Sequence, residues 1–428
     1  MTRGSRALCA AVCAVAVSAV YAAQPVLARI GGSLGLPEGR LGWVVAAGQL
    51  GYLIGLAVLV PLGDRKDRRT LIAGQLLLTS AGSLLAATAT RTWMLLAGLA
   101  LAGLFAVVVQ TTVAYAAALS APEERGRTLG VVTSGVVLGI LGSRVAAGAL
   151  SALWGWRSVY LLLAALPAIL ACLVLGALPK DTRPDRATHP RAPAAPAAPA
   201  APAALFREGA FVSRGLIAFF LFASFGTLWS GLALPLAAAP WHLDTARIGL
   251  FGLAGLAGAL GAARAGRWAD AGFAHAVTGG ALTLLTASWL AIGQASWSLW
   301  LAAGGVVLLD LAVQAVHVSN QHLLTTTYPH RPSSVIGGYM IFYSLGSALG
   351  ATATTAAFAH GGWPGSSVLG AAFAGCALLV WAVCPARSAR PRPSGDDGPP
   401  RPRQPAPAAG SPHLPAGPTS AGPGKECR

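Results

Sequence analysis

Twelve long apolar segments constrain this chain more than any other feature of its sequence. Six lie at about 7–30, 41–63, 70–90, 93–120, 128–153 and 158–179, and six more at about 211–239, 248–268, 273–293, 296–324, 333–359 and 365–385. An α-helix needs roughly 20 apolar residues to cross the hydrocarbon core of a bilayer, and each segment is about that long or longer. The sequence therefore predicts an all-α polytopic membrane protein with twelve transmembrane helices.

The composition indicates that lipid is the main solvent of the chain. Of its 428 residues, 55% are hydrophobic and only 10% are charged, whereas about a quarter of a soluble domain is charged. A net charge of +16 would suggest a nucleic-acid partner in a soluble protein. Here the basic residues fall in short loops on one side of the apolar segments, so we expect no nucleic-acid partner. The six cysteines show no metal-ligand spacing, and we expect no metal and no cofactor.

The positions of the basic residues predict the orientation of the chain in the membrane. With the N-terminus in the cytoplasm, the cytoplasmic segments carry 24 Lys and Arg residues and the outer loops carry five. An excess of this kind on the cytoplasmic side sets topology, so we expect both termini to be cytoplasmic. The first apolar segment follows Arg3 and Arg6 and could be mistaken for a signal peptide. Its removal would leave an odd number of spans, so we expect it to be retained.

The two halves of the chain align with a nearly constant shift of 207 residues. The matched positions are Arg40–Gly42 with Arg247–Gly249, Gly48 and Gly51 with Gly255 and Gly258, Pro122 with Pro329, and Gly155–Trp156 with Gly362–Trp363. Matches of Arg, Pro and Trp in loops are harder to obtain by chance than matches of Ala or Leu. Because each half has six spans, both halves enter the membrane from the same side. The sequence therefore predicts two parallel repeats, related by an axis along the membrane normal.

These repeats define the predicted domain organisation. An N-terminal six-helix bundle covers 1–179 and a C-terminal bundle covers 211–385, with an Ala/Pro-rich cytoplasmic linker at 180–210 between them. Repeated proline in the linker removes amide donors and excludes helical geometry. The tail at 386–428 is rich in Pro, Gly and Arg, and we expect it to be disordered.

The loop after the second segment carries a family signature. Residues 61–69 read PLGDRKDRR, which resembles the G-x-x-x-D-[RK]-x-G-[RK]-[RK] loop of the major facilitator superfamily. The matching residues are Asp64, Arg65, Arg68 and Arg69, whereas Val60 and Asp67 replace the two glycines. The resemblance covers roughly 7–385 and implies the twelve-helix fold of that superfamily. It also implies a transporter of a small molecule rather than an enzyme, embedded in the bilayer as a monomer.

The second half keeps part of the same signature, with Gly266 and Asp270 at the corresponding positions. An aspartate at a helix end can pair with loop arginines or with a helix N-terminus across the bundle interface. We therefore interpret these six residues as a gate that holds the cytoplasmic side closed. The alternative is that the arginines only enforce topology.

Two further stretches resemble a bacterial drug-efflux-like branch of the superfamily, namely Tyr21–Pro25 and the sequence LLDLAVQAVHVSNQ at 308–321. This resemblance implies a bacterial inner-membrane protein that exports a drug-like or metabolite substrate in exchange for protons. Proton-coupled uptake of a small metabolite, and a membrane sensor that does not transport, remain alternatives.

The tenth segment contains the most informative residues for mechanism. Asp310, Gln314, His317 and Gln321 are spaced to share one helical face. An aspartate near the middle of a span costs about 2.5–3.5 kcal/mol on insertion scales, and such residues typically mark an ion, proton or substrate path. We interpret Asp310 as the carrier of the coupling proton, with His317 relaying it or contacting substrate. A structural carboxyl, hydrogen-bonded between helices, is the alternative.

Arg144 in the fifth segment is the second charge within a span. Gly135, Gly139 and Gly142 form a small-residue face on the same helix, from which Arg144 should point away. A buried guanidinium would need an anion such as Asp310 or an anionic substrate; extension of the side chain to the outer interface is the alternative. Residues expected to line the cavity also include Gln24, Gln110 and Tyr115, whereas Trp229 is assigned to packing.

Overall fold

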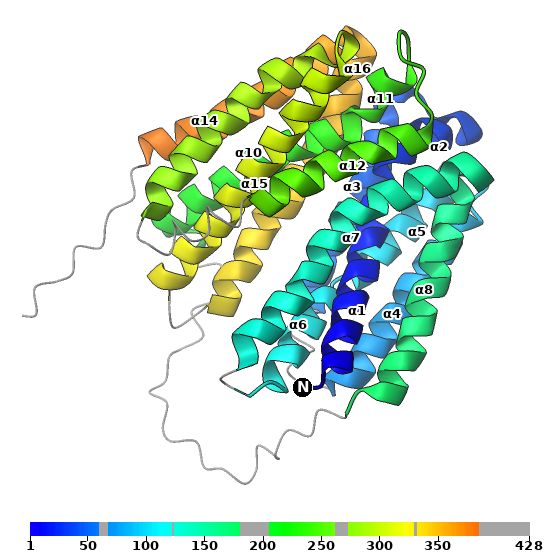
Figure 1. Cartoon of the computed structure of the whole chain (residues 1–428), viewed down its shortest axis with the longest axis vertical. Coiled ribbons are helices and arrows are strands. Elements are labelled where there is room, and N and C mark those ends of the chain that lie inside the picture. The colour runs from blue at the N-terminus through cyan, green and yellow to red at the C-terminus, as the bar shows by residue number, and fades with distance from the viewer. Residues whose placement is uncertain (60–66, 122–123, 180–204, 262–272, 329–331, 385–428) are drawn as a thin grey trace, which may run out of the picture. The chain divides into compact units, whose positions relative to one another are not determined.

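The computed structural model describes residues 1–59, 67–121, 124–179, 205–261, 273–328 and 332–384, and every regular element in these ranges is a helix (Figure 1). In the first half these are α1 (Arg3–Tyr21), η1 (Gln24–Val26), α2 (Leu27–Leu34), η2 (Glu38–Arg40), α3 (Gly42–Val58), α4 (Arg68–Ala87), α5 (Thr92–Phe105), α6 (Val108–Ala118), α7 (Arg125–Trp154) and α8 (Trp156–Ala177). In the second half they are α10 (Gly209–Gly231), α11 (Ala233–Ala237), α12 (Thr245–Gly261), α14 (Ala274–Ile292), η6 (Gly293–Ser296), α15 (Leu299–Thr327) and α16 (Pro332–Val383).

Each predicted apolar segment corresponds to a helical stretch of the structure. Within the described ranges, ten helical stretches are long and apolar enough to cross a membrane, and Thr245–Leu260 is a shorter apolar helix. The longest element, α16, contains Gly362 with non-helical backbone angles, so it comprises two helices that meet there. These stretches account for the twelve predicted helices.

Two glycines form equivalent helix junctions in the two halves of the chain. Gly155 separates α7 from α8 with φ +80°, and Gly362 divides α16 with φ +59°. Glycine adopts these left-handed angles without the steric cost that a Cβ atom would impose. The two junctions are related by the shift of 207 residues found in the sequence.

Two apolar segments that the sequence presents as continuous are broken by proline. The segment at 7–30 is interrupted after α1 at Gln24–Val26, and the segment at 211–239 is interrupted at Leu232, between α10 and α11. A proline ring clashes with the carbonyl group four residues earlier in a helix. For Pro25 that residue is Tyr21, where α1 ends, and for Pro235 it is Gly231, where α10 ends. Each of these two predicted spans is therefore present but is made of more than one helical element. The segment at 93–120, which contains no proline, is also divided, into α5 and α6.

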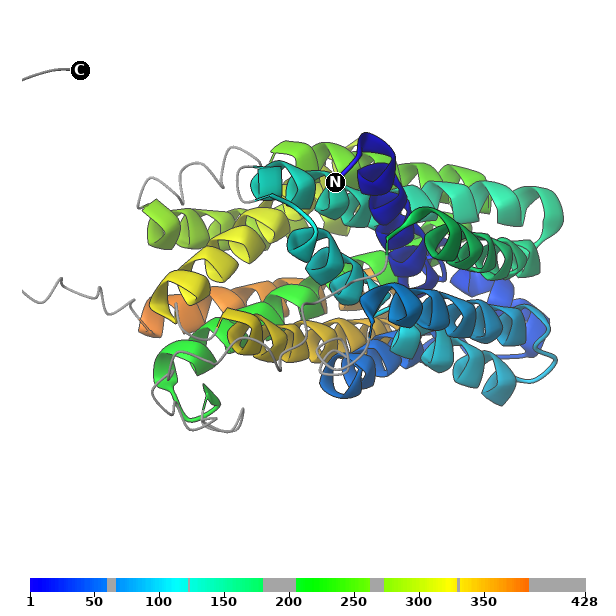
Figure 2. The same ribbon diagram turned by 90° about the horizontal axis from the view of Figure 1, so that it is seen from below.

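The described residues, which end at 384, lie in a single compact unit. The helices of its first half (blue to sea-green) lie together, and so do those of its second half (green to orange), as Figures 1 and 2 both show. Helix pairs approach closely at glycines. A Cβ atom on Gly51 of α3 would collide with the Ala100 carbonyl of α5, and one on Gly258 of α12 would collide with the Val307 carbonyl of α15. These two contacts are also related by the shift of 207 residues.

The end of the predicted linker belongs to the packed unit. Leu205 is buried, and the Phe206 ring lies against the rings of Phe211 and Phe342. Residues 205–210, at the end of the predicted linker, thus pack against the helices of the second half. The rest of the linker up to 204 and the predicted tail lie outside the described residues.

Candidate functional site

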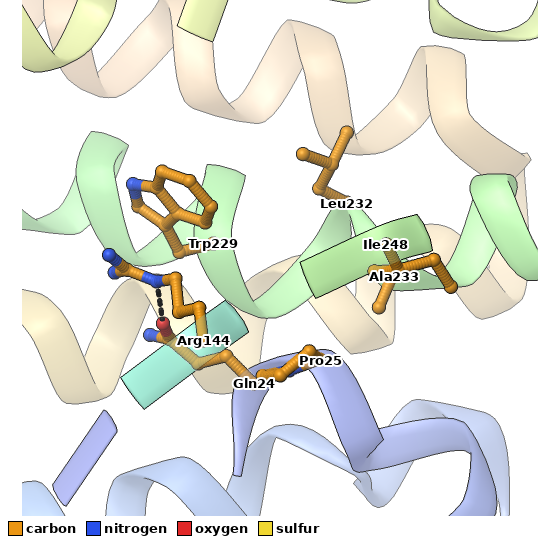
Figure 3. A pocket seen from close by; sticks show the side chains of 7 residues that line it. All are labelled: Gln24, Pro25, Arg144, Trp229, Leu232, Ala233 and Ile248. Atoms are coloured by element: carbon orange, nitrogen blue, oxygen red, sulfur yellow. Dashed lines mark hydrogen bonds between the residues drawn. The ribbon is translucent and has the colours of Figure 1, made fainter. Parts of the chain in front are cut away.

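A pocket lies where the two proline-broken helices meet. Its empty volume is about 240 Å³, and Figure 3 shows the seven side chains that line it: Gln24, Pro25, Arg144, Trp229, Leu232, Ala233 and Ile248. The first two residues come from the break after α1, and Trp229, Leu232 and Ala233 come from the break after α10. Interrupted helices at corresponding positions of two repeats are typical of the substrate sites of secondary transporters.

Arg144 is the cationic residue of this pocket. Its side chain is 1% exposed, so the alternative in which it reaches the outer interface does not hold in this structure. Nε donates a hydrogen bond of 2.9 Å to Oε1 of Gln24. The guanidinium carbon lies 3.7 Å from the centroid of the Trp229 ring, which is a close cation–π contact (Figure 3). Together these contacts fix the orientation of the guanidinium plane.

The small-residue face of α7 is partly as predicted. Cβ atoms added to Gly135 and Gly139 would collide with Ala10 and Ala14 of α1, so these two glycines allow close helix packing. Gly142 has open space in the same position and does not contribute to the contact. Arg144 follows this face and points to the pocket instead.

Arg144 and Asp310 are both buried charges whose hydrogen-bonding capacity is incompletely used. Neither Nη1 nor Nη2 of Arg144 has a hydrogen-bond partner among the described residues, and the same holds for Oδ2 of Asp310. Asp310 is 1% exposed. The only ion pair found between described residues joins Arg6 and Glu124, so the guanidinium of Arg144 does not pair with Asp310 in this structure.

Two glycines of α12 make room for these charged side chains. A Cβ atom on Gly252 would lie 3.2 Å from Cβ of Arg144. A Cβ atom on Gly255 would lie 2.9 Å from Oδ2 of Asp310 and 2.8 Å from Cζ2 of Trp229, closer than real Cβ contacts are found. The Trp229 ring therefore contacts Arg144 on α7 and also lies beside Asp310 on α15. Sequence reasoning used Gly255 only as a repeat marker and assigned Trp229 to packing, whereas Trp229 lines the pocket.

The other residues predicted on α15 form a separate cluster with aromatic side chains. Nδ1 of His317 lies 3.0 Å from the hydroxyl of Tyr339, and Nε2 lies 3.0 Å from the amide nitrogen of Gln321. Phe222 packs edge-on against the His317 ring. These partners, rather than Asp310, occupy the ring nitrogens of His317. Gln314 is half-buried on α15.

The remaining predicted cavity residues lie in different places. Gln24 lines the pocket, and Nε2 of Gln110 donates a hydrogen bond of 3.2 Å to the hydroxyl of Tyr52. Tyr115 is fully buried, and its hydroxyl donates to the Pro179 carbonyl just after α8, so it does not line the pocket. The structure brings Gln24 and Arg144 together and leaves Tyr115 apart from them.

Four of the six residues of the predicted gate lie outside the described residues, namely Asp64, Arg65, Gly266 and Asp270. Arg68 and Arg69 begin α4, and Arg68 is buried. Asp67 precedes them and caps the helix, since its carboxylate accepts hydrogen bonds from the backbone amides of Arg69 and Thr70. A carboxylate at this position satisfies amide donors that have no partner inside the helix.

Comparison with known proteins identifies the class of protein. The family model of the Major Facilitator Superfamily matches residues 7–351. The chain is 40% identical over 367 residues to the putative uncharacterized transporter YgaY of Escherichia coli K12, covering 86% of this chain and 92% of that protein. It is 33% identical over 387 residues to the probable transporter SCO4007 of Streptomyces coelicolor, with coverages of 89% and 87%. The chain therefore belongs to the Major Facilitator Superfamily.

A more limited match concerns drug resistance. The chain is 30% identical over 249 residues to the chloramphenicol resistance protein of Streptomyces lividans, covering 54% of this chain and 62% of that protein. Among solved structures, a bacterial homolog of the human lysosomal transporter Spinster, in an inward-facing and occupied conformation, matches with a TM-score of 0.71. That match has 15% identity and covers 88% of this chain and 94% of the other, and it shows the fold. The protein is thus a multi-pass membrane protein with bacterial relatives, and a secondary transporter of small molecules.

Proposed function

We propose that this transporter exports a drug-like or metabolite molecule in exchange for protons, and that Asp310 carries the coupling proton. The observation that supports this most directly is the burial of the Asp310 carboxyl group, with Oδ2 unpartnered among the described side chains, beside Trp229 of the pocket. An ionised carboxylate in such surroundings is costly unless it is paired. Asp310 is therefore expected to bind a proton when its surroundings are dry and to release it when a conformational change admits water.

Alternating access provides that conformational change. In the proposal, the two helix bundles rock about the pocket and expose it to one side of the membrane at a time, with monomeric protein as the working unit. Substrate contacts in the pocket and proton binding at Asp310 communicate through Trp229, because this ring touches Arg144 and lies beside Asp310. The partial likeness to a chloramphenicol resistance protein supports export as the direction.

Everted membrane vesicles with an acid interior test this proposal. A pH-sensitive dye reports the interior pH while amphipathic cations, organic acids, sugars and amino acids are added in turn. We expect at least one compound to cause proton release in the wild type and none in Asp310→Asn. Asp244→Asn is the matched control, because Asp244 is exposed and its carboxylate caps α12 through the amide of Arg247.

Two outcomes would contradict the proposal. Proton release that persists in Asp310→Asn would remove Asp310 from the coupling step. A wild-type protein that is inserted in the membrane but releases no protons with any compound would contradict export by antiport. It would then favour proton-coupled uptake, which the same dye reports when the vesicles are right-side-out.

A further inference from the structure

The guanidinium of Arg144, which lines the pocket, has two nitrogens, Nη1 and Nη2, without a hydrogen-bond partner among the described residues. We propose that the pocket binds the carboxylate of a small organic acid, through Nη1 and Nη2 of Arg144. This inference rests on the proposed transport function and names the substrate class for the same site. The proposal starts from a side chain that is 1% exposed and has two donor nitrogens without a partner among the described residues. Burial of such donors is costly, so a group that accepts from both is expected to bind there.

The geometry of the guanidinium selects a carboxylate over a single acceptor atom. A guanidinium can donate two parallel hydrogen bonds to the two oxygens of a carboxylate, and such charge-assisted pairs are about twice as strong as neutral ones. Nε is already used by Gln24, and the plane is held against Trp229. The two free nitrogens are therefore preorganised as a pair, which reduces the entropy lost when an anion binds.

Arg144 forms no direct ion pair with another described residue, although the charge of Asp310 acts on it at longer range. Asp310 is the nearest candidate on the neighbouring helices, yet no nitrogen of Arg144 lies within ion-pair distance of a carboxylate in the described chain. Trp229 contacts Arg144 and also lies beside Asp310. An anion that enters the pocket would thus find a guanidinium that is not held in a direct ion pair.

The remaining walls of the pocket describe the rest of the ligand. Pro25, Leu232, Ala233 and Ile248 are apolar, so the body of the ligand should be apolar as well. The apolar walls and the single cationic residue of the pocket together favour an aromatic or aliphatic monocarboxylate.

Binding measurements on the purified full-length chain in lipid nanodiscs test this assignment. The probes are acetate, butyrate, phenylacetate and benzoate, each compared with its own uncharged amide, and benzylammonium serves as a cation of similar size. Binding is followed by isothermal titration and by the shift in thermal unfolding temperature. We expect at least one carboxylate to bind about tenfold to a hundredfold more tightly than its amide, as the loss of charge-assisted hydrogen bonds predicts.

Three variants locate the effect at Arg144. Arg144→Gln should remove the preference for the carboxylate, and Arg144→Lys should retain part of it, because lysine keeps the charge but loses the paired donors. Arg157→Gln is the matched control and should leave the preference unchanged. Arg157 also lies over a tryptophan, with its guanidinium carbon 4.4 Å from the centroid of the Trp156 ring, but it is exposed.

The proposal is overturned if no carboxylate binds more tightly than its amide to the wild type, and this comparison does not depend on any variant folding correctly. It is also overturned if a carboxylate preference persists in Arg144→Gln. Because binding is measured without a proton gradient, the result is independent of the antiport assay. A carboxylate that binds without driving proton release would contradict the proposed coupling but leave the substrate class standing.

Discussion

Two arginines of this protein lie over tryptophan rings, and their surroundings differ. Arg157 is exposed, and its Nη2 donates to the Ala89 carbonyl at 2.9 Å, while Nε1 of its partner Trp156 donates to the hydroxyl of Ser33 at 2.8 Å. Arg144 is buried with two nitrogens that have no partner among the described residues, and the Trp229 side chain interacts with the carboxyl group of Asp310.

The comparison separates a structural pair from one that is open to a ligand. At Arg157 a backbone carbonyl group and solvent accept hydrogen bonds from the guanidinium, so this pair is structural. At Arg144 the donors are buried at a cost that protein groups do not offset. We therefore expect these buried donors to serve binding or transport, since functional residues often lower the free energy of unfolding.

The largest expected difference between the two pairs is in transport. Arg144→Gln should lower the rate of substrate-dependent proton release by about a hundredfold, because two charge-assisted hydrogen bonds to substrate are lost. Arg157→Gln should leave the rate within about twofold of the wild type. Initial rates in everted vesicles, normalised to the amount of inserted protein, measure both. Equal loss in the two variants would mean that the burial of Arg144 has no special role.

A smaller effect is expected where α12 makes room for the buried pair. Gly255→Ala would place a methyl group 2.8 Å from Trp229 and 2.9 Å from Asp310, so one of them must move. Overpacking of this kind costs about 1–3 kcal/mol. We expect a lower unfolding temperature together with weaker carboxylate binding.

The control for that substitution is Gly142→Ala on α7, where the added methyl group meets open space. Alanine favours a helix over glycine by about 1 kcal/mol, so this variant should be unchanged or more stable. If Gly255→Ala behaves like Gly142→Ala, the close approach of Trp229 and Asp310 to α12 is not needed for the site.

The smallest expected effect is on the free energy of unfolding. Its sign should differ between the two arginines. Arg144→Met should raise the free energy of unfolding by about 1 kcal/mol, since an apolar side chain of similar length replaces an incompletely paired buried charge. Arg157→Met should lower it by about 0.5–1 kcal/mol, through the loss of its hydrogen bond and its cation–π contact. Thermal unfolding in detergent without added anions measures both changes. A marked destabilisation by Arg144→Met would indicate that Arg144 holds the fold together.

The aspartate of α15 has a counterpart in the first half that shows how the two repeats diverged. Position 310 corresponds to Gly103 of α5 by the shift of 207, and Gly255 corresponds to Gly48 of α3. A Cβ atom on Gly103 would collide with the Gly48 carbonyl. One half thus uses glycine for tight helix packing where the other places a carboxyl group beside a glycine. The proposed proton carrier therefore sits at a helix crossing that both halves share.

The sequence by itself determined the membrane class, the helices and several of the buried polar residues. Runs of about 20 apolar residues specify spanning helices, because lipid offers no partner for unpaired backbone groups. For the same reason a charge inside such a run, such as Asp310 or Arg144, is conspicuous in the sequence. Gln24 was expected in the cavity, and it lines the pocket beside Arg144.

Only the tertiary structure decided which of these residues meet. Arg144 and Gln24 are 120 positions apart, and the contact of Arg144 with Trp229 joins helices from the two halves of the chain. Such contacts depend on helix packing and on the proline breaks after α1 and α10, and hydrophobic periodicity carries no information about them. Tyr115 lies apart from this pocket, and Trp229, which lines it, was assigned to packing, because an aromatic residue in an apolar segment looks the same in sequence whether it fills a core or holds a buried cation.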